Sequence, residues 1–228
     1  MDYMKTTEEG LEEALAPPPP YVKSGFLYRV YALLTCQILV TGGICTGALF
    51  WHPMEWIRAP QTPLVSMFVA FPILCAIPLV HNKHPWNILC LGTFTVAMSA
   101  LVANAITIIQ QPNVVLEALA ITSVIFLSLS SVALVTKRDF SFMGAWLACS
   151  IVSLLVFSLI QLFVFSPWLH VAVSWVGVVV FSGYILYDTS MMVNHYGPDD
   201  AIGACLNLYL DVLNLFMMLI NVLSTGRD

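Results

Sequence analysis

The residues of this sequence that could do chemistry are two carboxylates in otherwise apolar stretches. Asp211 lies in the middle of AIGACLNLYLDVLNLFMMLINVL, Ala201 to Leu223, and Asp188 ends the apolar segment before it. At 100° per residue, Asn207, Asp211 and Asn214 fall within one narrow arc of a helix. A carboxylate in hydrocarbon costs about 2.5–3.5 kcal/mol. We therefore expect this polar arc to face protein or water.

Asp188 and Asp211 would form a proton sensor if their carboxyl groups met. Two carboxylates in a low dielectric cannot both ionise cheaply, so one proton is shared between them. Once deprotonated, the pair is a hard oxygen site suited to Ca²⁺. They meet only if the helix that carries Asp188 continues past Tyr187 towards Met192, or if the following loop dips into the membrane. The alternative is that both aspartates are structural, hydrogen-bonded to polar side chains of neighbouring helices.

The sequence gives less support to an enzymatic function. The sequence has no HExxH, no GxSxG and no Cys–His grouping, so we expect no catalytic residues. An intramembrane aspartyl protease also uses two membrane aspartates, within motifs that resemble YD and GxGD. Tyr187-Asp188 supplies a YD, but Leu-Tyr-Leu precedes Asp211 where the protease motif has Gly-x-Gly. A protease is thus the weakest of the three alternatives.

The composition indicates a membrane protein. Hydrophobic residues make up 59% of the 228 residues and charged residues only 9%, and the mean hydropathy is +0.87. A soluble domain is typically about 25% charged. All six cysteines lie inside apolar runs without regular spacing, which favours small core residues over disulfides or a metal site. We expect no cofactor, and no nucleic acid as a partner.

Apolar runs of helical length predict an all-α, polytopic protein with a bundle of seven helices. A flexible acidic and Pro-rich tail over residues 1–25 precedes this transmembrane domain of residues 26–228. The last segment either spans the membrane or is re-entrant. The predicted segments are Val30–Trp51, Pro63–Val80, Trp86–Ile109, Val114–Leu134, Phe142–Phe165, Trp168–Tyr187 and Ala201–Leu223.

The distribution of basic residues predicts the orientation. Six Lys and Arg residues lie on the side of the N-terminal tail, and Arg58 and Arg227 lie on the other side if the last segment spans. Because cytoplasmic loops carry the excess of Lys and Arg, the N-terminus is expected in the cytosol.

The tail also carries a candidate ligand for a partner protein. Pro18, Pro19 and Tyr21 belong to a PPxY sequence, which WW domains bind as a polyproline II helix. The alternative is a stiff spacer before the membrane.

Five blocks in order resemble the transmembrane Bax inhibitor motif family, and most closely its Lifeguard branch. The similarity covers nearly the whole membrane part of the chain, from about Phe26 to Leu223. The blocks are FLYRVYALLTCQILVT, HPWNILCLGTFTVAMS, TKRDFS, YILYDTSMM and LNLYLDVLNLF.

The resemblance implies a pH-sensitive Ca²⁺ leak in an internal membrane, the endoplasmic reticulum or the Golgi, and suppression of apoptosis through that leak or through apoptosis regulators as partners. It assigns the gate to Asp188 and Asp211, which would also contact the ion. Bacterial relatives latch the last-helix aspartate to an arginine near the end of the second helix. This chain has no arginine there, so His81 and Lys83 are the candidate latch. The competing hypothesis is a membrane-embedded interaction protein whose aspartates are structural.

Overall fold

The computed structural model describes residues 20–50, 56–80, 83–161, 163–164 and 166–225, without the side chains of residues 20–23. In these ranges the chain is helical and contains no strand. Seven of the helices are long and apolar enough to cross a membrane. The predicted seven-helix membrane fold is thus confirmed. The helices are α2 Pro20–Phe50, α3 Thr62–Val80, α4 Trp86–Ile109, α5 Pro112–Thr136, α6 Gly144–Gln161, α7 Pro167–Asn194 and α8 Ala201–Thr225, with short 3₁₀ turns η2 Ser141–Met143 and η3 Pro198–Asp200.

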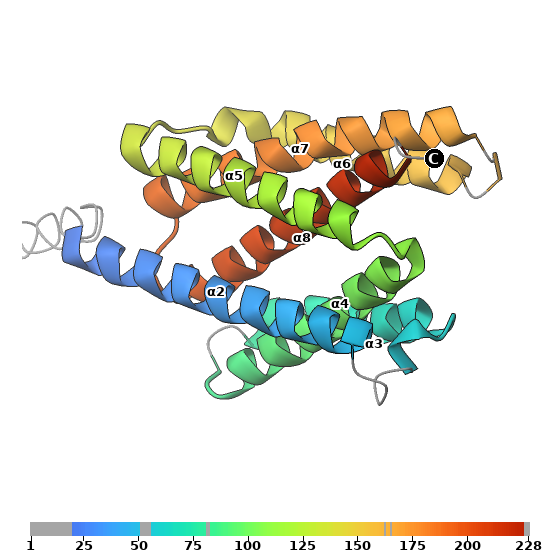
Figure 1. The fold of residues 1–228 in the computed structure, drawn as a ribbon. Helices are drawn as coiled ribbons and strands as arrows, with labels where there is room; N and C mark the ends of the chain where they lie inside the picture. The colour runs from blue at the N-terminus through green and yellow to red at the C-terminus, as the bar shows by residue number, and fades with distance from the viewer. Residues whose placement is uncertain (1–19, 51–55, 81–82, 162, 165, 226–228) are drawn as a thin grey trace, which may run out of the picture.

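The helix α8 lies at the centre of the bundle. It packs against α7, α2, α5 and α4, while α3 packs on α4 and α6 packs on α7. Figure 1 shows α8 crossing the molecule diagonally, with α2 and α4 on one side of it and α5 and α7 on the other. As a result, 61% of the apolar window of α8 is buried, compared with 17% for α3 and 11% for α6.

The outer helices expose large apolar side chains. Phe68 of α3 is 81% exposed, and Leu155 and Leu159 of α6 are each 60% exposed. Such continuous apolar surfaces are rare on water-soluble monomers. They are the expected lipid-facing surface of a membrane bundle, in which lipid tails cover the outer faces.

Short connections fix the antiparallel order of the helices. Gln110 and Gln111 separate α4 from α5, and Pro112 and Pro167 stand in the first turns of α5 and α7, where proline loses no helical hydrogen bond. We call the side on which α2, α4, α6 and α8 begin the tail side. In Figure 1 it is the left side, opposite the C-terminal end of α8.

Three predicted boundaries differ from the structure by more than two residues. The first helix begins at Pro20, before the predicted Val30, and α6 ends at Gln161, before the predicted Phe165. The helix α7 continues past the predicted end at Tyr187 to Asn194. The last segment is one uninterrupted helix of 25 residues, long enough to span.

Candidate functional site

The length of α7 places Asp188 inside the bundle. Asp188 precedes the last residue of α7 by six positions, which is about 9 Å along the helix, and Asp211 lies ten positions into α8, about 15 Å. Because α7 and α8 run antiparallel and pack closely, both aspartates lie in the tail-side half of the membrane.

The carboxyl groups of Asp188 and Asp211 contact each other across the α7–α8 interface. Each residue is only 6% exposed, and the two side chains lie close enough to interact directly. An ionised carboxylate can only accept, so a hydrogen bond between the two groups requires a proton on one of them. The oxygen Oδ2 of Asp211 is buried and accepts from no N–H or O–H donor among the described residues. The pair can therefore hold one shared proton.

The polar arc of α8 extends from this pair towards the tail side. Asn207 is exposed, and its side chain lies within hydrogen-bonding reach of the hydroxyl of Tyr196 in the α7–α8 loop. Burial raises the pKa of Tyr196 to about 12, and the nearby Asp188 adds to this effect. The Tyr196 hydroxyl therefore stays protonated at physiological pH. Asn214 is half-buried on the same arc, one turn beyond Asp211.

A polar clamp holds the tail-side end of α7. The carbonyl oxygen of Arg138, in the α5–α6 loop, accepts hydrogen bonds from Ser190 Oγ at 3.0 Å and from Asn194 Nδ2 at 3.3 Å. The hydroxyl of Ser190 also accepts from the Phe140 N–H at 2.9 Å. These bonds satisfy the polar side chains in the last turns of α7 and so explain why the helix continues beyond Tyr187.

Of the two candidate latch residues, the structure describes only Lys83. Lys83 lies exposed in the turn between α3 and α4. The ion pair found within the described ranges joins His195 Nε2 to Asp139 Oδ2 at 3.0 Å, and it involves neither Lys83 nor the aspartate pair. His81 lies outside the described residues, as do Pro18 and Pro19 of the PPxY sequence, while Tyr21 lies in the first turn of α2. Both assignments stay predictions.

Sequence reasoning missed a second polar face of α8. Cys205 Sγ donates to Gln37 Oε1 at 2.8 Å, and the hydroxyl of Tyr209 lies 2.8 Å from that of Thr41. Gln37 also donates to Thr95 Oγ1 at 2.8 Å, and Thr41 bonds to Ser99 on α4. Single polar residues in apolar segments gave no signal, because the partners come from α2 and α4, far away in the sequence.

The two aspartates do not by themselves make a complete metal site. No group of three or more His, Cys, Asp or Glu side chains gathers anywhere in the part of the chain that the structure describes. Two carboxylates alone make a weak Ca²⁺ site, which suits passage of an ion better than its storage.

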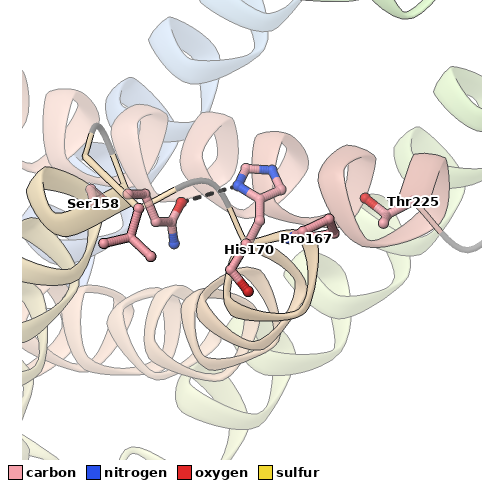
Figure 2. Close-up of a pocket in the computed structure, with 7 residues that line it drawn as sticks. Ser158, Pro167, His170 and Thr225 are labelled. Carbon is pink, nitrogen blue, oxygen red and sulfur yellow. Dashed lines mark hydrogen bonds between the residues drawn. The ribbon is translucent and has the colours of Figure 1, made fainter.

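An open cavity of about 540 Å³, with a mostly apolar lining, lies at the other end of the bundle. It opens at the turn between α6 and α7, beside the end of α8 (Figure 2). His170 Nδ1 lies 3.1 Å from Gln161 Oε1, so the imidazole ring and the side-chain amide share a hydrogen bond. Eighteen residues of α7, about 27 Å, separate His170 from Asp188. This cavity is not part of the aspartate site.

Comparison with known proteins assigns the chain to a family. The family model described as "Inhibitor of apoptosis-promoting Bax1" matches residues 23–228. This chain belongs to the Bax inhibitor motif family. The resemblance expected from the five sequence blocks is confirmed.

Relatives within the Bax inhibitor motif family come from plants, viruses and fungi. Protein LIFEGUARD 4 of Arabidopsis thaliana is 33% identical over 99% of this chain and 96% of its own length. The Golgi anti-apoptotic protein of Vaccinia virus (strain Lister) is 32% identical over 94% of this chain and 91% of its own length. Bax inhibitor 1 of Schizosaccharomyces pombe is 34% identical over 89% of this chain and 77% of its own length. The names of the Vaccinia virus and Schizosaccharomyces pombe relatives describe an anti-apoptotic protein and a Bax inhibitor.

Proposed function

We propose that this protein suppresses apoptosis by leaking Ca²⁺ out of an internal store, through a path that protons control at Asp188 and Asp211. The names of the relatives support the anti-apoptotic role, and that of the Vaccinia virus relative supports the Golgi as the compartment. The buried carboxyl pair supports the ion chemistry, since intramembrane acids usually mark ion or proton pathways.

The single observation that carries the proposal is the contact between the two carboxyl groups. While they share a proton, a hydrogen bond joins α7 to α8 and the pair carries one negative charge. Loss of that proton leaves two like charges in contact, which repel each other and attract a divalent cation. Charge on the pair therefore opens the cation path, and protonation closes it.

The test is Ca²⁺ flux into liposomes that contain the purified protein, measured from pH 5 to pH 8. We expect flux to rise with pH, by at most about tenfold per pH unit for the loss of one proton. Asp211→Asn and Asp188→Asn keep the size and hydrogen-bonding capacity of the side chain but remove its charge. Each substitution should abolish the pH response.

A matched control is Asp139→Asn, which removes a carboxylate from an exposed loop on the tail side. This variant should keep the pH-dependent flux. Flux equal to that of empty liposomes, from protein shown to be folded by circular dichroism, would leave the competing hypothesis of an interaction protein with structural aspartates.

A further inference from the structure

Three hydroxyl groups from three helices converge in the interior of the bundle. They belong to Tyr31 of α2, Ser130 of α5 and Thr189 of α7. Ser130 is 4% exposed and Thr189 is fully buried. The ring of Tyr31 is held in place by an edge-on contact with Phe126, with ring centroids 6.5 Å apart.

These hydroxyls lack the partner that other buried hydroxyls have. In a membrane helix a Ser or Thr hydroxyl is usually satisfied by the carbonyl oxygen four residues earlier. Five buried residues of this bundle follow that rule: Thr41, Thr95, Ser99, Thr122 and Ser174. Ser130 and Thr189 do not. The hydroxyl of Tyr31 lies near both of theirs, yet none of the three completes an aligned hydrogen bond to any described residue.

Unsatisfied hydroxyls are costly inside a membrane. Each buried donor or acceptor without a partner costs about 1–3 kcal/mol. Three of them turned towards one another, and away from their own helix carbonyls, form a small oxygen cluster whose lone pairs are open to a further ligand. Neutral hydroxyl oxygens are hard ligands, which suit a cation that keeps part of its water shell.

The place of the cluster links it to the carboxyl pair. Thr189 directly follows Asp188, so its side chain leaves α7 about 100° further around the helix. Asp188 faces α8, while Thr189 faces Ser130 on α5 and Tyr31 on α2. A cation at the hydroxyls would thus be bound on the face of α7 next to the one that carries Asp188.

We propose that Tyr31, Ser130 and Thr189 form a second, neutral oxygen site, which binds the partly dehydrated Ca²⁺ ion as it passes the aspartate pair. This inference rests on the proposed leak. The carboxyl pair supplies the charge and the proton dependence, and the hydroxyl site supplies oxygen ligands that do not titrate in the physiological range.

The test uses near-isosteric substitutions with controls matched in chemistry and burial. Thr189→Val and Ser130→Ala remove the clustered hydroxyls. Thr122→Val and Ser174→Ala remove buried hydroxyls that are satisfied within their own helices. At pH 8 we expect the first two variants to lower Ca²⁺ flux about tenfold, as for the loss of one good ligand. They should retain the pH dependence of the wild type, and the controls should match the wild-type flux.

Equal flux in test and control variants, with a wild-type leak that Asp211→Asn abolishes, would overturn the hydroxyl site and leave the leak standing. If the wild type shows no leak at all, the melting temperature of the purified protein in millimolar Ca²⁺ decides separately. A rise of about 2–4 °C that Thr189→Val removes and Thr122→Val keeps would support the site. A rise that both variants keep, or no rise, would overturn it. Ser130→Ala gives the same comparison if Thr189→Val does not fold.

Discussion

At the residue scale, the charged groups outside the membrane act differently from the buried aspartate pair. Asp139 is exposed, and its pKa lies below the ordinary value of 3.8, chiefly because the Ser141 N–H donates to the carboxylate at 2.8 Å. The contact with His195 lowers the pKa further. The native protein therefore releases the proton of Asp139 more readily than the unfolded chain does. The resulting stabilisation is present above pH 3.8 and is lost as the pH falls through the lower native pKa.

Asp139→Asn should accordingly lower the melting temperature at pH 5, and this difference from the wild type should shrink as the pH falls to 3. Asp199→Asn is the control, because Asp199 is an exposed carboxylate that makes no hydrogen bond to the described residues. A difference that stays constant from pH 5 to pH 3 would contradict the assigned role of Asp139.

The sequence predicts the aspartates but not their surroundings. Asp188 and Asp211 could be found because a carboxylate in an apolar segment is costly and therefore rare. Tyr31, Ser130 and Thr189 could not, because an isolated Ser, Thr or Tyr in a membrane helix is ordinarily satisfied locally. Only the arrangement of three helices shows that these hydroxyls turn towards each other.

At the scale of the element, the contact between α7 and α8 depends on Gly177. A Cβ atom built on this glycine would lie 2.7 Å from Met218 Sδ and 2.8 Å from its Cγ. The two helices thus approach as closely as they do because position 177 has no side chain. The aspartate pair lies in the same interface, eleven residues along α7.

Gly177→Ala should destabilise the protein by about 1–3 kcal/mol, because the added methyl group displaces Met218 or separates the helices. The double variant Gly177→Ala/Met218→Ala should cost less than the sum of the two single variants. Gly203→Ala on α8 is the control, since a Cβ there meets nothing within 4 Å, and helix propensity favours alanine by about 0.5–1 kcal/mol. Thermal unfolding in detergent measures all four.

Helix boundaries were predicted correctly where neighbouring residues in the sequence end the helix. They were missed where contacts with distant parts of the chain decide where the helix ends. Trp86–Ile109 was predicted to the residue, since a proline turn precedes it and polar Gln110-Gln111 follow. The end of α7 was missed because Asp188, Ser190 and Asn194 look like the start of a loop. In the structure their polar groups bond to α8 and to the α5–α6 loop, so the helix continues.

At the scale of the whole molecule, the fold places the cationic residues unevenly on the two sides of the bundle. Arg58 lies opposite the tail side, and its guanidinium donates to the carbonyl oxygens of Ala48 and Leu49 at the end of α2. Arg58 therefore caps the C-terminal end of α2 in addition to contributing a positive charge to this side. The remaining excess of Lys and Arg on the tail side predicts that this side faces the cytosol.

Single-cysteine labelling tests this orientation. Lys83→Cys lies on the tail side and Asn113→Cys on the opposite side, and both positions are exposed. The background lacks the native cysteines, and Cys205 is replaced by Ser to keep the donor to Gln37. A membrane-impermeant maleimide should label position 83 as soon as the plasma membrane is selectively permeabilised, and not before. Position 113 should react only after the internal membrane is also opened. The reverse order would contradict the orientation.

The two polar faces of α8 have a mechanical consequence. One face meets Asp188, and the other is tied to Gln37 and Thr41 by hydrogen bonds of 2.8 Å from Cys205 and Tyr209. Turning α8 to separate the aspartates would break bonds that no water can replace in a dry membrane interior. The helix α8 is thus fixed to α2 and α4, so that a separation of the aspartates requires a movement of α7. At its tail-side end, α7 is held by hydrogen bonds to the α5–α6 loop.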